Sequence, residues 1–144
     1  HTAAFLGNLK AIQQHINAGS ELNVKDEYGS SPLIIAITFG KTEVAKALIE
    51  GGADLNSTNN DGSTSLHIAA FFCRTEIVEA LLDKGVDKTV KNNYGSTALE
   101  SISGPFENVK GIYEQMNKDL GALGLKLDFK QLESTRPIIA EMLK

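Results

Sequence analysis

The sequence predicts an all-α repeat protein, a solenoid of stacked helix-turn-helix units joined by hairpin-like loops. The main observation is that three sets of residues recur every 33 positions: Gly29, Gly62 and Gly95; Leu33, Leu66 and Leu99; and Gly19, Gly52 and Gly85. A second observation is that residues 42–49 (TEVAKALI) align with residues 75–82 (TEIVEALL) without a gap. One such unit is too small to fold alone, and stacking several units buries their apolar faces.

The first helix of each unit has a start signal and an end signal. Ser31, Thr64 and Thr97 stand in register as N-cap residues, whose hydroxyl groups can accept hydrogen bonds from the first helical turn. Pro32 follows at the first helical position, where its missing N–H has no effect. Gly40 is expected to end the helix in a conformation with positive φ.

The second helix is predicted to be capped by Thr42 or Thr75 and to carry one apolar face. In the first copy this face consists of Val44, Ala45, Leu48 and Ile49. Gly52 and Gly85 are expected to end the two helices. The chain then turns at residues 59–62 (NNDG), where glycine suits the tight position of a hairpin-like turn.

These features resemble the ankyrin repeat family. Residues 62–70 (GSTSLHIAA) match the first half of the family motif, and residues 52–56 (GADLN) match the second half. The resemblance covers residues 1 to about 117 and divides the chain into a truncated repeat 1–25, repeats 26–58 and 59–91, and a degenerate repeat 92–117. It implies that the turns form a row of fingertips and that the first helices line a concave surface.

Residues 118–144 are predicted to form a helical C-terminal cap, because a repeat array needs an end unit that is apolar inward and polar outward. A long helix is expected from Glu107 to about Leu120, followed by breaks at Gly121 and Gly124. Asp128 is expected to cap a short helix. Pro137 is expected to open a last helix, whose apolar side carries Ile138, Ile139, Met142 and Leu143.

Composition narrows the classes of function. The formal net charge is −4 and no Lys/Arg cluster is present, so a nucleic acid is not expected as the partner. No apolar run has the roughly 18 residues that a spanning helix needs, so membrane insertion is not expected. Cys73 is the only cysteine, which excludes an internal disulfide and favours the cytoplasm, although export stays open. Nothing in the pattern requires a dimer, and a monomer is expected.

The chain begins with His1 inside a helical pattern, so we expect the natural protein to extend further toward its N-terminus. Two hypotheses on function follow. The first is a non-catalytic scaffold that binds a protein or peptide. The alternative is that this chain is the ankyrin portion of a longer polypeptide with an enzymatic or membrane domain before it.

No convincing catalytic set, metal site or cofactor motif is found. His67 is interpreted as a structural residue that bonds near Thr64 and toward the next repeat, since no carboxylate or second histidine shares its register. Cys73 stands at the repeat position that Gly7 and Gly40 occupy in the two preceding repeats. A left-handed conformation there would cost a non-glycine residue roughly 1 kcal/mol. A third hypothesis, a small-molecule enzyme site, is placed around Phe106, Tyr113 and Arg136.

The partner is expected to contact the fingertips and the end of the first helix of each repeat, at the two positions that precede Gly7, Gly40 and Cys73. Aromatic side chains dominate interface energies, and several occur there at a spacing of 33. The predicted contact residues are Phe5, Leu6, Tyr28, Thr38, Phe39, Asn60, Asp61, Phe71, Phe72, Asn93 and Tyr94. For Phe71 and Phe72 an equal alternative is that the rings pack against each other or against the C-terminal cap.

Overall fold

The computed structural model describes residues 31–123 and 125–144. Within these ranges the chain forms seven α-helices and no strand: α3 (Pro32–Thr38), α4 (Thr42–Glu50), α5 (Ser65–Phe71), α6 (Thr75–Asp83), α7 (Ala98–Ile102), α8 (Lys110–Leu120) and α9 (Phe129–Leu143). Two short 3-10 helices, η1 (Phe106–Asn108) and η2 (Gly121–Leu123), flank α8. The predicted repeat 1–25 lies outside the described residues.

The first helices begin as predicted. Ser31, Thr64 and Thr97 have extended backbones, and each side-chain oxygen accepts a hydrogen bond from the peptide N–H three residues on. At Thr97 a second hydrogen bond runs in the opposite direction, because the Glu100 side chain accepts from the Thr97 N–H at 2.9 Å. This hydrogen bond lowers the pKa of the Glu100 carboxyl group. Gly40 follows α3 with φ at +69°, which confirms its predicted conformation.

The second helices carry the predicted apolar face but begin differently. Val44, Ala45, Leu48 and Ile49 are all buried. Thr42 and Thr75, however, are the first residues of α4 and α6 and not their caps. The prediction was wrong by one position, because the three-residue turns bring the chain into helical geometry at the threonine itself.

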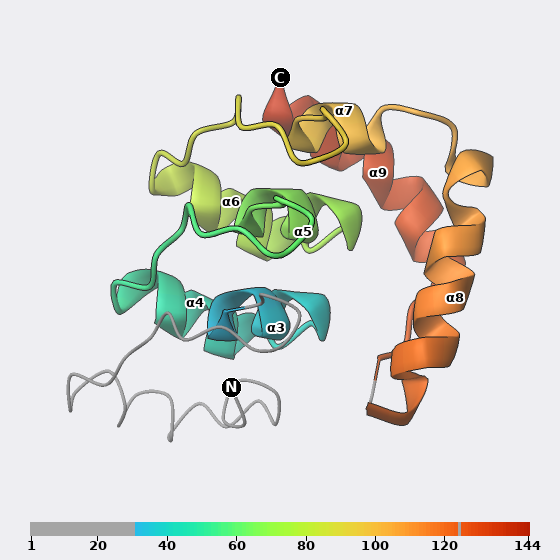
Figure 1. Cartoon of the computed structure of the whole chain (residues 1–144), viewed down its shortest axis with the longest axis horizontal. Coiled ribbons are helices and arrows are strands. Elements are labelled where there is room, and N and C mark those ends of the chain that lie inside the picture. Colours follow the sequence, from blue (N-terminus) through green and yellow to red (C-terminus); the bar gives the residue numbers. More distant parts are fainter. Residues whose placement is uncertain (1–30, 124) are drawn as a thin grey trace.

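The helices stack as a solenoid, which confirms the predicted fold class. Figure 1 shows three helix pairs in layers: α3 with α4, α5 with α6, and α7 with α9. Apolar residues from all three pairs join one continuous core, in which Ala36, Ala69 and Ala70 are small enough to let neighbouring helices approach. The interior therefore runs through the stack.

The loops between pairs form the predicted hairpin-like turns. In the loop before α5, the Asn59 N–H donates to the Ser63 carbonyl and the Gly62 N–H donates to the Asn59 carbonyl, both at 3.0 Å. The loop before α7 repeats these bonds between Asn92, Ser96 and Gly95. Gly62 and Gly95 have φ of +72° and +76°, which explains why glycine recurs there.

The C-terminal helices differ from the prediction. Pro137 lies inside the single helix α9 and does not open a new one. Its side chain is exposed, so the ring does not enter the packing of α9 against the core. The buried face of α9 consists of Leu132, Arg136, Ile139 and Leu143, whereas Ile138 is 57% exposed. The helix predicted from Glu107 begins only at Lys110, after η1.

Helix α9 lies where the second helix of the last pair is needed. It runs antiparallel to α7 and also contacts α5 and α6 (Figure 1). Its Ile139 and Leu143 complete the core. Residues 103–128 separate α7 from α9, and their helix α8 runs along the side of the stack. The array thus ends with a helix supplied from the far end of the sequence.

Candidate partner-binding surface

The fingertip loops are held by asparagine side chains. Oδ1 of Asn59 accepts from the N–H groups of Asp61 and Ser63, at 2.9 and 3.1 Å. Oδ1 of Asn92 accepts in the same way from Tyr94 and Ser96, at 3.0 and 3.2 Å. Such bonds bend the chain locally into a fixed turn. Both tips are therefore ordered by their own sequence.

The two described tips are also bonded to each other. The Asn93 N–H donates to the Asp61 carbonyl at 2.8 Å, and its side-chain Nδ2 donates to the Asn60 carbonyl at 3.0 Å. Asn93 thus bridges the tips through its backbone and its side chain. The side chains of Asn60 and Asp61 are exposed, and that of Tyr94 is 76% exposed. The bridge fixes the spacing at which these groups meet solvent.

His67 has the structural role predicted from its register. The Thr64 N–H donates to Nδ1 at 3.1 Å, and Nε2 lies 2.9 Å from the Ser96 carbonyl. Because a peptide N–H can only donate, Nδ1 is the acceptor and Nε2 carries the proton that it donates to Ser96. The neutral imidazole therefore links the start of α5 to the next fingertip loop, and both ring nitrogens are occupied.

The end of α3 holds two further predicted contact residues, Thr38 and Phe39, which are both half-buried. The Thr38 hydroxyl donates to the Ile34 carbonyl at 2.9 Å. Arg74 of the next repeat donates to the carbonyls of Ile37 and Thr38 at 3.0 and 2.8 Å. These bonds supply donors to carbonyl groups in the last turn of α3, which have no partner within the helix. This clamp was not predicted, since it joins residues from different repeats.

The structure places the Phe71 ring against helix α8 and buries the Phe72 ring. Phe72 is 3% exposed. Phe71 stacks on the ring of Tyr113 with centroids 4.5 Å apart, and the two phenylalanine rings meet edge to face. The alternative that the two rings pack against each other therefore describes both side chains, and Phe71 also packs against Tyr113 of α8. Phe5, Leu6 and Tyr28 lie outside the described residues.

Tyr113, Arg136 and Cys73 form a buried cluster beneath the cap. The Tyr113 hydroxyl donates to the Phe71 carbonyl and accepts from Arg136 Nη1 at 3.0 Å. Burial raises the pKa of the Cys73 thiol to about 11 and the pKa of Tyr113 to about 12. Cys73 has the same left-handed conformation as Gly40 at the equivalent position, with φ at 56° and 69°. A protonated, buried thiol is a poor nucleophile, so Cys73 has a structural role.

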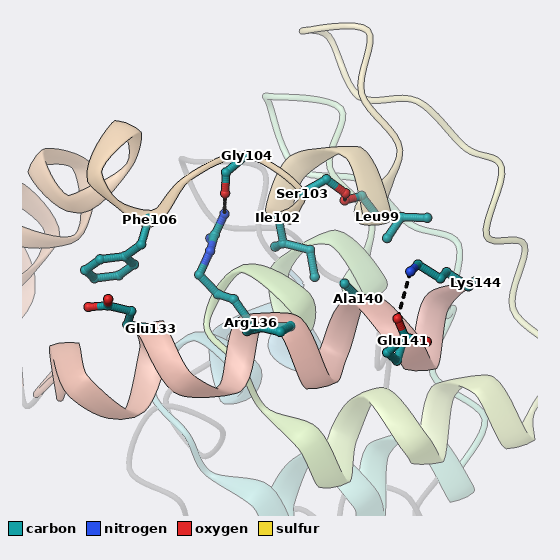
Figure 2. Close-up of a pocket in the computed structure, with 11 residues that line it drawn as sticks. Leu99, Ile102, Ser103, Gly104, Phe106, Glu133, Arg136, Ala140, Glu141 and Lys144 are labelled. Carbon is teal, nitrogen blue, oxygen red and sulfur yellow. Dashed lines mark hydrogen bonds and ion pairs between the residues drawn. The ribbon is translucent and has the colours of Figure 1, made fainter.

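The third hypothesis placed a small-molecule site at Phe106, Tyr113 and Arg136. Phe106 and Arg136 do line a groove of about 530 Å³ between α7 and α9, as Figure 2 shows. Tyr113 is fully buried and does not line it. In the part of the chain that the structure describes, no three His, Cys, Asp or Glu side chains gather in a way that could hold a metal ion.

The membrane prediction concerns helix length. Among the helices of residues 31–123 and 125–144, none is long and apolar enough to cross a bilayer.

Comparisons with known sequences agree with the repeat register and the stacked helix pairs. The family model for ankyrin repeats, in three copies, matches residues 1–92 of the 144 residues. A comparison with curated proteins finds no match. The matched part covers more than half of the chain and includes the helix pairs α3/α4 and α5/α6. The chain belongs to the ankyrin repeat family.

Proposed function

We propose that this chain is a non-catalytic module that binds a partner protein or peptide through its fingertip loops and its concave face, and that it acts as a monomer. Ankyrin repeats are generally protein–protein interaction modules. The described residues support a binding role over catalysis, because the histidine has both ring nitrogens occupied and the only thiol is buried.

Tyr94 is the observation that carries the proposal. Its ring is 76% exposed at the tip of a loop whose backbone is held by Asn92 and by the bridge from Asn93 to the neighbouring tip. A large ring on an ordered loop loses little conformational entropy on binding, so it can contribute much of the interface energy. Exposed side chains of Asn60 and Asp61 lie on the adjacent tip and can supply polar contacts.

The proposed surface continues to Thr38 and Phe39 at the far end of α3. Phe71 and Phe72 contribute less than the sequence suggested, since Tyr113 covers one ring and the other is buried. The contact surface is therefore centred on the two tips and on the repeat that contains α3. Phe5, Leu6 and Tyr28 remain part of the proposal on the strength of their register.

The test is a pull-down with mass spectrometry in which the intact chain is the bait and the Tyr94→Ser variant is compared with wild type. We expect recovery of the specific partner to fall at least about tenfold, which is a typical loss for a central aromatic anchor. Ile138→Ser is the matched control, because it removes an exposed apolar side chain from helix α9 and leaves the residues of both tips unchanged. Melting temperatures of both variants should stay close to wild type. Partner recovery that depends on Ile138 and not on Tyr94 would contradict the proposal.

A further inference from the structure

The groove between α7 and α9 has an apolar floor and one buried charge. Leu99 and Ile102 line it from α7, and Pro137 and Ala140 line it from α9. The guanidinium of Arg136 rises from α9 toward Gly104 at one end, as Figure 2 shows. The volume of about 530 Å³ lies in the range of small-molecule sites. The groove is separate from the fingertips and plays no part in the proposed function.

The charge of Arg136 has no counter-ion among the described residues. The side chain is 3% exposed, and its two hydrogen bonds go to neutral oxygens, the Tyr113 hydroxyl and the Gly104 carbonyl. The ion pairs of residues 31–123 and 125–144 do not include it. A buried cation without an anion is costly, because it has lost its hydration. An anion in the groove would remove this cost.

The geometry leaves the guanidinium able to bind such an anion. It carries five N–H groups in a planar fork, and the two bonds to Tyr113 and Gly104 use only part of them. The bond to Gly104 is long, at 3.4 Å, and this carbonyl belongs to an exposed loop. A carboxylate could take over this bond and pair with the fork through two oxygens.

We propose that the groove binds a small organic monoanion, a carboxylate with a short apolar body. Its carboxylate pairs with Arg136 and its body lies on Leu99, Ile102 and Ala140. The rim explains the preference for a single charge. Glu133 and Glu141 also line the groove, and the Lys144 Nζ group is paired with Glu141 at 2.7 Å, so a dianion such as phosphate would meet more repulsion than attraction.

Sodium hexanoate at pH 7 is the probe, since it is ionised there and has an aliphatic body of suitable length. Binding is measured with the intact ¹⁵N-labelled chain by amide chemical shifts and by the melting temperature. We expect a Kd of about 1 mM, typical of a ligand with few atoms, and shifts at Ile102 and Gly104. Hexan-1-ol, and sodium chloride at equal ionic strength, should produce neither effect. Equal effects from hexan-1-ol or from chloride would overturn the proposal.

Two variants locate the site. Ala140→Phe fills the groove without touching the hydrogen-bond partners of Arg136, and Arg136→Lys keeps the charge but loses the planar fork. Each should weaken hexanoate binding at least about tenfold. If Arg136→Lys fails to fold, Ala140→Phe decides the matter alone, and unchanged binding to it would overturn the proposal. Tyr94→Ser should bind hexanoate like wild type, which separates this site from the partner surface.

Discussion

Residues 31–83 contain two helix pairs of the stack and residues 98–143 contain one, and the two regions connect the helices of a pair differently. In the first region a three-residue turn separates the two helices of a pair, as between α5 and α6. In the second region residues 103–128 lie between α7 and its partner α9. The core accepts both arrangements, because it requires an apolar helix face at the right place and not a particular connection.

The two regions also differ in what joins their parts. Neighbouring repeats meet through small and aliphatic side chains, with added polar links from Arg74 and His67. The inserted segment packs through a second apolar cluster centred on Tyr113, and the guanidinium of Arg136 bonds to the Tyr113 hydroxyl. Hydrogen bonds to the carbonyls of Phe71 and Gly104 add polar links between this segment and the rest of the stack.

The largest expected effect comes from removing the helix that distinguishes the second region. Deletion of residues 129–144 exposes the core that Ile139 and Leu143 cover. We expect a lower melting temperature or aggregation, because a repeat array without its cap exposes the apolar surface of its last layer to water. Thermal melting followed by circular dichroism and light scattering would show either result. An unchanged melting curve would mean that α9 does not close the stack.

A matched pair of point variants controls for the size of the deletion. Ile139 is fully buried and Ile138 is 57% exposed, although they are neighbours in α9. Ile139→Ala should lower the free energy of unfolding by about 3 kcal/mol, whereas Ile138→Ala should change it by less than about 0.5 kcal/mol. Equal losses would favour the helix predicted from the sequence, in which both isoleucines face the interior.

The second prediction concerns pH and the cluster under the cap. Burial raises the pKa of Cys73 from 9.0 to about 11 and that of Tyr113 from 10.0 to about 12. Above pH 9 the unfolded chain releases protons that the folded chain keeps, so stability falls as pH rises from 9 toward 12. The full loss is about 2–3 kcal/mol for each group.

Urea unfolding at pH 8 and at pH 10.5 measures this loss. Cys73→Ala removes one of the two titrating groups, so its stability should decline less between the two pH values than that of wild type. A decline as steep as in wild type would show that the thiol does not contribute.

The local features of the fold could be predicted, because their causes lie within a few residues. Ser31, Thr64 and Thr97 cap helices whose first turn follows directly, and Gly40 ends α3 by its own conformation. His67 could be assigned a structural role because the register of the repeats places the loop of Ser96 beside it. These predictions needed only the period of 33 residues and the chemistry of each side chain.

The remaining features depend on contacts that the repeat does not encode. Phe39 and Phe72 occupy equivalent positions, yet Phe39 is half-buried whereas Phe72 is 3% exposed and meets the ring of Phe71 edge to face. Pro137 is typical of a helix start, but α9 already begins after the cap Asp128, and its buried face continues from Leu132 through Ile139 past the proline. The bond from Asn93 to Asn60 could have been predicted from the sequence, since the two asparagines are equivalent tip residues that lie 33 positions apart.

The smallest expected effect compares the inner fingertip with the last one. A methyl group added at Gly62 would lie 2.5 Å from Asn93 Oδ1, whereas nothing lies within 4 Å of the same position at Gly95. Both glycines have positive φ, so alanine at either position costs roughly 1 kcal/mol in backbone strain. Gly62→Ala should cost about 1 kcal/mol more, because the side-chain bond from Asn93 to Asn60 is displaced.

Chemical denaturation of the two variants measures the difference, and a third variant tests its cause. In an Asn93→Ala background the clash with the side chain is absent, although the Asn93 N–H still lies close to the added methyl group. The gap between Gly62→Ala and Gly95→Ala should therefore shrink without vanishing. A gap of the same size in both backgrounds would show that the Asn93 side chain does not couple the tips, and the spacing of the tips would then depend on the bond from the Asn93 N–H to the Asp61 carbonyl.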